Sequence, residues 1–162
     1  MTARPVIAYI GIGANLGDAI RSVKEALQEI ARLPDTRLRV HSDLYRTAPV
    51  DAGGDDYINA VAAVDTMLAP HALLEALQAI ELAHGRQRPY RNAPRTLDLD
   101  ILLHGDQSIT DAVLNIPHPR MTQRAFVLLP LLQIAPDIAI PGGAAARDYL
   151  AAVADQRIDK VI

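Results

Sequence analysis

Apolar residues recur along the chain with two different periods. From Ile20 to Leu33 they follow one another at steps of three and four residues, which is typical of an amphipathic helix, and the pattern stops before Pro34. Other segments are rich in β-branched and aromatic residues or alternate apolar with polar positions, as strands do. The segments predicted as strands are residues 6–12, 38–47, 57–67 and 97–103. The segments predicted as helices are residues 20–33, residues 70–84, a segment from about residue 121 and an alanine-rich segment over residues 144–154.

Turn-forming residues mark where these elements begin and end. Asp18 or Asn15 can cap the first helix, and Pro130 is expected to bend or end the third. Gly105-Asp106 is expected to close a hairpin after residue 104. Helices interleaved with hairpins favour an α+β fold, an αβα sandwich with a mainly antiparallel sheet, over a doubly wound parallel sheet. No repeat or linker divides the chain, so we expect one domain over residues 1–162.

The composition narrows the class of protein. The chain has 162 residues, of which 50% are hydrophobic and 22% charged, as expected for a compact globular domain. No apolar run approaches the ~20 residues of a membrane-spanning helix. A net charge of −3 argues against nucleic-acid binding through bulk positive charge. The absence of cysteine excludes disulfides, thiolate metal sites and cysteine nucleophiles, and it suits a reducing compartment, so we expect a cytoplasmic protein without a targeting segment.

Candidate chemistry is concentrated just before and within the predicted strand 97–103. Asp98 and Asp100 alternate with apolar residues from Leu97 to Leu103, so a strand places both carboxylates on one face and the apolar side chains on the other. Their Cβ atoms are then roughly 6–7 Å apart. One or two carboxylates together with substrate phosphate oxygens are ligands that Mg²⁺ prefers. The alternative is that the two aspartates form only the polar face of an edge strand.

A loop rich in arginine leads directly into this strand. Guanidinium groups bind phosphate oxygens in a bidentate manner and stabilise the charge that develops in phosphoryl transfer. Together with the aspartates they describe a polyphosphate site, although a solvated surface loop would have the same composition. The arginines of this loop are Arg86, Arg88, Arg91 and Arg95.

Other patterns are weaker. No G-x-G-x-x-G or G-x-x-x-x-G-K-[ST] motif occurs, so neither a dinucleotide fingerprint nor a P-loop is supported. Glu81-x-x-His84 matches half of a di-iron ligand set, but a single copy is the ordinary end of a helix. His118 lies between two prolines, with Arg120 and Arg124 nearby; it is either an exposed loop residue or a ligand contact.

Six segments, taken in order, resemble the 6-hydroxymethyl-7,8-dihydropterin pyrophosphokinase family of folate biosynthesis. The run R-T-L-D-L-D-I-L-L, with P-H-x-x-M-x-x-R-x-F downstream, is the most specific part of the resemblance. The match covers nearly the whole chain. The six segments are A-Y-I-G-I-G-A-N-L-G-D (8–18), Y-R-T-A-P-V (45–50), D-Y-I-N-A-V (56–61), I-E-L-A-H-G-R (80–86), P-R-T-L-D-L-D-I-L-L (94–103) and I-P-H-P-R-M-T-Q-R-A-F-V-L-L-P-L (116–131).

The resemblance implies an enzyme that transfers the terminal diphosphate of ATP to the hydroxymethyl group of the pterin and releases AMP. It also implies a ferredoxin-like αβα sandwich, a monomer, ATP as co-substrate and two Mg²⁺ ions held with the help of Asp98 and Asp100. Small molecules are then the partners, with neither nucleic acid nor membrane. The residues it implies for catalysis are Arg86, Arg95, Asp98 and Asp100; for ATP, Glu81, Arg88, His118 and Arg124; and for the pterin, Thr47, Val50, Tyr57, Asn59 and Phe126.

The resemblance further assigns detail within these sets. Tyr57 and Phe126 are expected to sandwich the pterin ring, and Asn59 to bind its hydrogen-bonding edge. Members of the family close mobile loops over both substrates, and residues 48–56 and 85–94 have the matching composition.

The chain departs from some members at a few positions. The departures are Asn92-Ala93 where some have Trp-Gly, with Tyr90 as a substitute for the indole, Pro119 where some have tyrosine, and Val113 where some have arginine. These affect details of the ATP contacts. Two other classes of function remain open on the residues alone: a metal-dependent polyphosphate hydrolase, which has no use for a pterin pocket, and a noncatalytic small-molecule-binding module.

Overall fold

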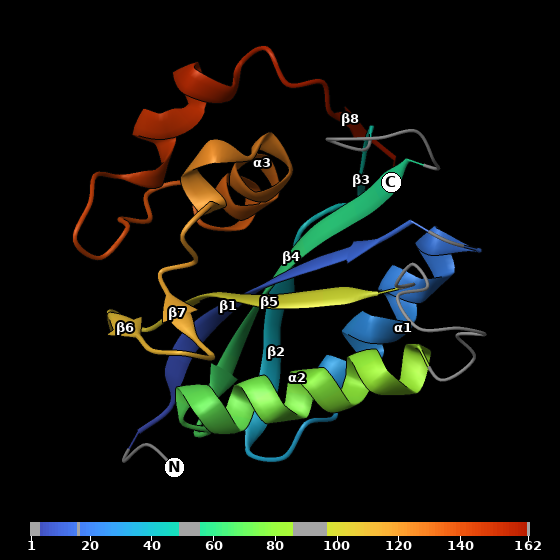
Figure 1. Cartoon of the computed structure of the whole chain (residues 1–162), viewed down its shortest axis with the longest axis vertical. Coiled ribbons are helices and arrows are strands. Elements are labelled where there is room, and N and C mark those ends of the chain that lie inside the picture. The colour runs from blue at the N-terminus through green and yellow to red at the C-terminus, as the bar shows by residue number, and fades with distance from the viewer. Residues whose placement is uncertain (1–3, 16, 49–55, 86–96, 162) are drawn as a thin grey trace.

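The computed structural model of the chain describes residues 4–15, 17–48, 56–85 and 97–161. Its centre is a six-stranded sheet in which every pairing is antiparallel (Figure 1). The strand order is β5-β1-β4-β3-β8, and β2 pairs with β4 beside β3. The strands of this sheet are β1 (Val6–Ala14), β2 (Thr36–His41), β3 (Tyr45–Thr47), β4 (Tyr57–Thr66), β5 (Asp98–His104) and β8 (Asp159–Lys160).

Helices cover both faces of the sheet, which makes the fold an αβα sandwich. The helices α1 (Ala19–Ala31) and α2 (Pro70–His84) pack on one face, and α3 (Ala125–Ile134) and the 3-10 helix η2 (Ala146–Val153) on the other (Figure 1). A two-stranded hairpin of β6 (Ile109–Thr110) and β7 (Asn115–Ile116) and a 3-10 turn η1 (Met121–Gln123) complete the described elements. The expected α+β class and the mainly antiparallel sheet are confirmed.

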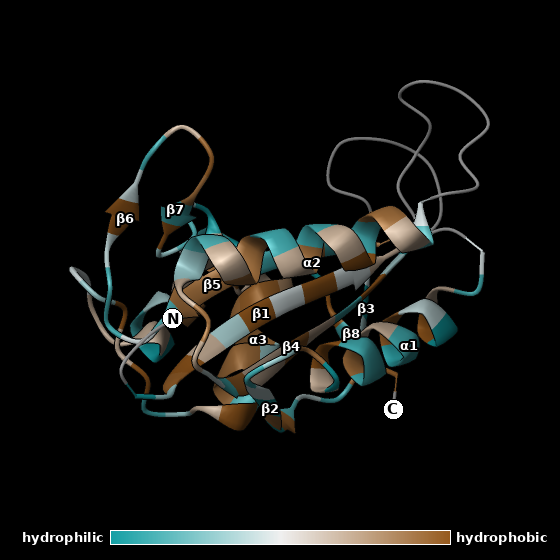
Figure 2. Ribbon diagram, turned by 90° about the horizontal axis from the view of Figure 1, so that it is seen from below, coloured by the Kyte–Doolittle hydropathy of each residue, from teal (hydrophilic) through white to brown (hydrophobic). Residues whose placement is uncertain are grey.

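Each face of the sheet has its own apolar core, because successive residues of a strand point to opposite faces. Ile10 and Ile12 of β1 face α1 and α2, whereas Tyr9 lies in the cluster under α3. β4 is buried at eight of its ten positions because it is covered on both sides. Brown apolar stretches accordingly line the facing surfaces of sheet and helices in Figure 2.

Several predicted boundaries are confirmed, and local chemistry explains them. Asp18 caps α1, its side chain accepting a hydrogen bond from the Arg21 amide at 3.1 Å. α2 spans the predicted residues, with Pro70 in its first turn and Gly85 at its end. In the described part of the chain, no helix has the length and apolarity needed to cross a membrane.

The predicted strand over residues 38–47 is in fact two strands. Between β2 and β3, the buried hydroxyl of Ser42 accepts a hydrogen bond from the Val61 amide at 2.9 Å, where an uninterrupted strand would offer a backbone carbonyl. The side chain thus takes part in the backbone pairing and the strand is interrupted.

The hairpin predicted at Gly105-Asp106 is wrong. Gly105, with φ of 58°, turns the chain away from β5, and the next two strands pair with each other instead. The turn between them is held by Asp111, whose carboxylate accepts hydrogen bonds from the amides of Val113 and Leu114.

The strict alternation predicted along residues 97–103 is also wrong at its end. An irregularity in the β1–β5 pairing between Tyr9 and Ile10 leaves Leu102 without a partner in the register, so Leu103 turns to the α3 side with Leu102. Leu99 and Ile101 keep the predicted side, under α2.

The C-terminal helices also differ from the prediction. Arg124 is extended, with φ of −128°, and separates η1 from α3, so no single helix starts at Met121. α3 continues past Pro130 to Ile134. The alanine-rich helix is a 3-10 helix over Ala146–Val153, two residues shorter than predicted at its start and one shorter at its end.

Candidate active site

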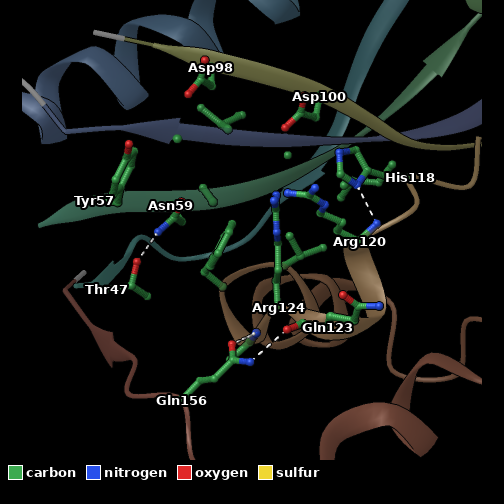
Figure 3. Close-up of a pocket in the computed structure, with 18 of the residues that line it drawn as sticks. Thr47, Tyr57, Asn59, Asp98, Asp100, His118, Arg120, Gln123, Arg124 and Gln156 are labelled. Atoms are coloured by element: carbon green, nitrogen blue, oxygen red, sulfur yellow. Dashed lines mark hydrogen bonds between the residues drawn. The ribbon is translucent and has the colours of Figure 1, made fainter. Parts of the chain in front are cut away.

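A cavity of about 1020 Å³ opens on the α3 side of the sheet. Its floor is formed by β1, β4 and β5, and its opposite wall by the segment that leads into α3, with the C-terminal segment after η2 at the rim (Figure 3). The volume is at the upper end of the range found for small-molecule sites, so it can take a ligand larger than a single ring system.

Two glycines keep the floor open. In the sheet register, Gly13 pairs with Asp98 on one side and Asn59 on the other, while Gly11 pairs with Asp100. Because neither glycine has a side chain, nothing projects from β1 between the acidic strand and β4. A Cβ atom on Gly13 would lie 3.1 Å from Oδ1 of Asn59, so a larger residue here would require the Asn59 side chain to shift by a few tenths of an ångström.

One wall of the cavity is acidic. Asp98 and Asp100 both point into it from β5, as the two-residue period predicts (Figure 3). The backbone between them is held by α2, since the Leu99 amide donates to Oε2 of Glu81 at 2.7 Å. Glu81 thus contacts the backbone that carries the aspartates, and its predicted part in ATP binding stays a prediction.

The facing wall is basic. The side chains of Arg120 and Arg124 extend toward the acidic strand, with His118 beside them (Figure 3). The His118 segment is tied to the sheet by the hydrogen bond from its own amide to the Leu102 carbonyl, at 3.0 Å. Guanidinium groups opposite carboxylates suit a ligand chain that is itself anionic and binds metal.

The surroundings of His118 favour the neutral form of its ring. Burial lowers its pKa, an effect that the carboxylate of Asp100 opposes. The guanidinium groups of Arg124 and Arg120 lower the pKa further. Its Nδ1 accepts a hydrogen bond from the Arg120 amide at 3.2 Å, which places the ring proton on Nε2, available for a ligand acceptor.

A smaller polar recess adjoins these walls on β3 and β4. Asn59 is only 4% exposed, and its Nδ2 donates to the Thr47 hydroxyl at 2.9 Å. Tyr57 and Phe126 line the same cavity. The Arg124 guanidinium lies over the Phe126 ring, with its central carbon 5.3 Å from the ring centroid. A cavity lined by a buried amide and two aromatic residues suits a flat heterocycle with a hydrogen-bonding edge.

The structure therefore brings together many of the residues predicted from sequence. Thr47, Tyr57, Asn59, Asp98, Asp100, His118, Arg124 and Phe126 all line the cavity. Val50, Arg86, Arg88, Arg95, Tyr90, Asn92-Ala93 and most of both predicted loops lie outside the described residues. Within the described ranges, no group of three or more histidine, aspartate or glutamate residues gathers as a metal site.

Sequence reasoning missed several lining residues. Arg120 and Gln123 belong to the segment 116–131, and the positive charge of Arg120 was a signal that could have identified it. Gln156 and Arg157 come from the C-terminal segment, and nothing in the local sequence marks them as part of a site.

Fold and cavity together define a class: an α+β sandwich with a cavity on one face of its antiparallel sheet, lined by carboxylates, guanidinium groups and a buried amide. Comparison with known proteins identifies the family. The sequence model of 7,8-dihydro-6-hydroxymethylpterin-pyrophosphokinase (HPPK) matches residues 9–136. The chain belongs to this family, and the identification made from the sequence is confirmed.

Two curated relatives match over nearly their whole lengths. The chain is 46% identical over 154 residues to the 2-amino-4-hydroxy-6-hydroxymethyldihydropteridine pyrophosphokinase of Pseudomonas aeruginosa, a match covering 94% of this chain and 95% of the relative. It is 40% identical to the protein of the same name from Haemophilus influenzae, covering 96% and 98%.

Solved structures agree in fold. The crystal structure of wild-type Plasmodium falciparum HPPK-DHPS with pterin and p-hydroxybenzoate superposes with a TM-score of 0.72 at 15% identity, covering 91% of this chain. The present chain spans 43% of that longer chain. At this identity the likeness establishes the fold alone.

Proposed function

We propose that this chain transfers the terminal diphosphate of ATP to the hydroxymethyl group of 6-hydroxymethyl-7,8-dihydropterin, releasing AMP, as a step of folate biosynthesis. The observation that carries the proposal is the cavity, where the aspartates of β5 face Arg124 across a glycine floor and a buried Asn59 adjoins them. Family membership supplies the reaction, and the cavity offers each substrate a chemically suitable place.

The pterin is placed in the recess at Asn59. A dihydropterin presents ring nitrogens, an amino group and a carbonyl along one edge, and the amide of Asn59 can both donate and accept there. Asn59 is buried and already bonded to Thr47, so its orientation is fixed before the substrate arrives. Tyr57 and Phe126 would stack on the two faces of the ring, and Val50 would complete the recess.

Asp98 and Asp100 fit Mg²⁺, because they offer hard carboxylate oxygens on one face of a strand and the phosphates supply the remaining ligands. Two ions are proposed. Bound Mg²⁺ would neutralise phosphate charge and orient the polyphosphate chain.

In the reaction, the hydroxymethyl oxygen attacks the β-phosphorus of ATP in line. The new oxygen–phosphorus bond forms as the bond from that phosphorus to the bridging α-oxygen breaks. AMP leaves with the electron pair, and the hydroxyl proton passes to a base. Little covalent chemistry falls to the protein, so positioning and electrostatic stabilisation account for the rate.

The residues of the basic wall would supply this positioning and electrostatic stabilisation. Arg124 and the Nε2–H of the neutral His118 would bind ATP oxygens, with Glu81 and Arg88 completing the ATP site. Arg86 and Arg95 are proposed to act on the transferring phosphates. The two predicted loops, which contain several of these residues, would close over the substrates and exclude water.

The remaining expectations concern the protein as a whole. We propose that residues 1–162 form one pterin pyrophosphokinase domain that acts as a monomer in the cytoplasm on small molecules, without nucleic acid or membrane. The net charge of −3 supports the absence of nucleic-acid binding, and the absence of cysteine supports the cytoplasmic location.

A product assay tests the reaction. ATP, Mg²⁺ and 6-hydroxymethyl-7,8-dihydropterin are incubated with the protein, and AMP, ADP, free diphosphate and pterin diphosphate are separated chromatographically, with a parallel reaction lacking the pterin. We expect AMP and pterin diphosphate in equal amounts. AMP with free diphosphate in the absence of pterin would indicate a hydrolase, ADP an ordinary kinase, and no nucleotide turnover a binding module.

A further inference from the structure

Gln156 bridges the backbone on both sides of Arg124. Its Nε2 donates to the Gln123 carbonyl at 2.9 Å, and its Oε1 accepts from the Ala125 amide at 2.8 Å. Both hydrogen bonds are drawn in Figure 3, where the Gln156 amide lies directly below the turn that carries Arg124. One side chain thus holds three consecutive residues of the basic wall.

The segment that Gln156 bridges does not cap the start of α3 with a side chain of its own. Arg124 is the extended residue between η1 and α3. The amide of Ala125 is one of the first amides of α3, which lack partners inside the helix. Gln156 supplies a partner for this amide from more than thirty residues away.

The C-terminal segment that carries Gln156 is itself anchored. Val153 at the end of η2 is 3% exposed and packs in the same core cluster as Met121 and Ala125. The backbone amide of Gln156 donates a hydrogen bond to the Val153 carbonyl at 3.0 Å. This bond closes a turn that returns the chain to the cavity. The backbone that carries the Gln156 side chain is therefore held in place.

Both residues that the bridge supports have a role in the proposed function. Arg124 is proposed to bind ATP, and Phe126, two residues further on, the pterin ring. The guanidinium lies over the ring at 5.3 Å, so a change in the direction of the chain at residue 124 would displace both groups.

We propose that Gln156 is a positioning residue of the active site, which holds the Gln123–Ala125 turn so that Arg124 and Phe126 point into the cavity. It makes the C-terminal segment, which lies beyond residues 9–136 of the family match, part of the substrate site. The inference rests on the proposed roles of Arg124 and Phe126 and adds a residue that neither sequence nor family comparison assigned.

Steady-state kinetics of the full chain test this proposal. Gln156→Ala removes both hydrogen bonds, and Gln156→Met removes them while keeping the length of the side chain. We expect both variants to raise KM for ATP and for the pterin by roughly three- to tenfold, the effect of losing one or two ordinary hydrogen bonds. The value of kcat should change less than KM, because the lost interactions serve ground state and transition state alike.

Asp155→Ala is the matched control, since Asp155 is the exposed neighbour of Gln156 on the same segment. It should leave both KM values and the melting temperature unchanged. Unchanged KM values in Gln156→Ala would overturn the proposal, as would a lower kcat and melting temperature at constant KM, the signature of a purely structural role. Wild-type KM values in Gln156→Met would do so too, because side-chain volume would then explain the effect.

The same experiment separates this proposal from the proposed function. If the wild-type chain does not turn over ATP and pterin, the proposed reaction fails, and the bridge is then judged by calorimetric affinity for the pterin and for Mg·ATP in the same variants. If the wild-type chain is active and Gln156→Ala behaves like Asp155→Ala, the bridge alone fails.

Discussion

Gly13 lies against Asn59 in the sheet register, and a methyl group on Gly13 would come within 3.1 Å of the Asn59 Oδ1 atom. Asn59 cannot move away at little cost, because it is 4% exposed and bonded to Thr47. We therefore expect Gly13→Ala to rotate the Asn59 amide and to raise KM for the pterin by roughly tenfold, about the value of one misplaced hydrogen bond to a buried group. KM for ATP should change much less. Kinetics with each substrate varied in turn measure both.

A double-mutant cycle shows whether the methyl group acts through Asn59. Asn59→Ala should weaken pterin binding far more than ATP binding, and adding Gly13→Ala to it should cost little more, since the side chain that the methyl displaces is gone. Additive effects of the two substitutions would contradict this explanation, and unchanged pterin affinity of Asn59→Ala by calorimetry would remove Asn59 from the pterin site.

The aspartates of β5 give the second prediction. Asp98→Ala and Asp100→Ala should each lower kcat by roughly a thousandfold or more, because a metal that stabilises phosphate charge contributes several kcal/mol. The fold should persist, since Asp100 is exposed and Asp98 only half buried, and circular dichroism with thermal melting checks this. EDTA should abolish turnover of the wild type, and added Mg²⁺ should restore it.

Asp106→Asn is the control for these variants. Asp106 is an exposed aspartate in the turn directly after β5, and it is not among the residues that line the cavity. It should retain full activity. Retained activity of Asp98→Ala or Asp100→Ala would exclude the metal role of that residue.

Local sequence patterns predicted the elements whose stability is local. The helix over residues 70–84 has its apolar spacing, its proline and its glycine within one stretch, and the structure matches it at both ends. The turn of Leu103 to the opposite face could not be predicted, because it depends on an irregularity in the pairing of β5 with a strand some ninety residues earlier. Likewise, the interruption between β2 and β3 depends on a hydrogen bond that the Val61 amide donates to the Ser42 hydroxyl.

The residues of the site also divide into those that the sequence predicted and those that it did not. Its acidic pair was predicted because a strand period places Asp98 and Asp100 on one face, and the pterin residues followed from the resemblance. Gln156 was missed because its two hydrogen bonds span 31 and 33 residues and a glutamine carries no charge signal. Long-range polar contacts of this kind leave no pattern in a single sequence.

Arg120 gives a third prediction, for a residue that the sequence analysis did not place in the site. Its side chain lines the cavity opposite β5, and its charge lowers the pKa of His118. We expect Arg120→Gln to raise KM for ATP by roughly tenfold, the value of a charge-assisted hydrogen bond, and to leave KM for the pterin nearly unchanged. The effect should shrink as ionic strength rises.

Arg147→Gln serves as its control. Arg147 is an exposed arginine on η2, paired with Asp137 at 2.9 Å. The substitution removes the same charge from the protein without touching the cavity. Equal changes in KM for ATP in both variants would mean that net charge, and not the position of Arg120, attracts the nucleotide.

The last prediction concerns the pH dependence of stability and the attachment of β8 to β3. Hydrogen bonds from Lys160 and from Gln133 lower the pKa of Asp43, and the Asp43 carboxylate in turn raises the pKa of Lys160. A carboxyl group whose pKa is lowered by folding stabilises the folded state above its unfolded pKa of about 4, and that contribution is lost as the pH falls through the lowered value. Asp43→Asn should therefore be less stable than the wild type at pH 7 and equally stable near pH 2. Urea unfolding at both pH values measures the difference, which should be small because the pair is exposed.

At high pH the same reasoning applies to Lys160, whose raised pKa keeps its contribution to stability until the pH rises through that value. Asp137→Asn, which removes an exposed carboxylate that pairs only with Arg147 among the described residues, should show a smaller pH dependence. Equal pH dependence in Asp43→Asn and Asp137→Asn would show that the Asp43–Lys160 pair adds nothing specific to the attachment of β8.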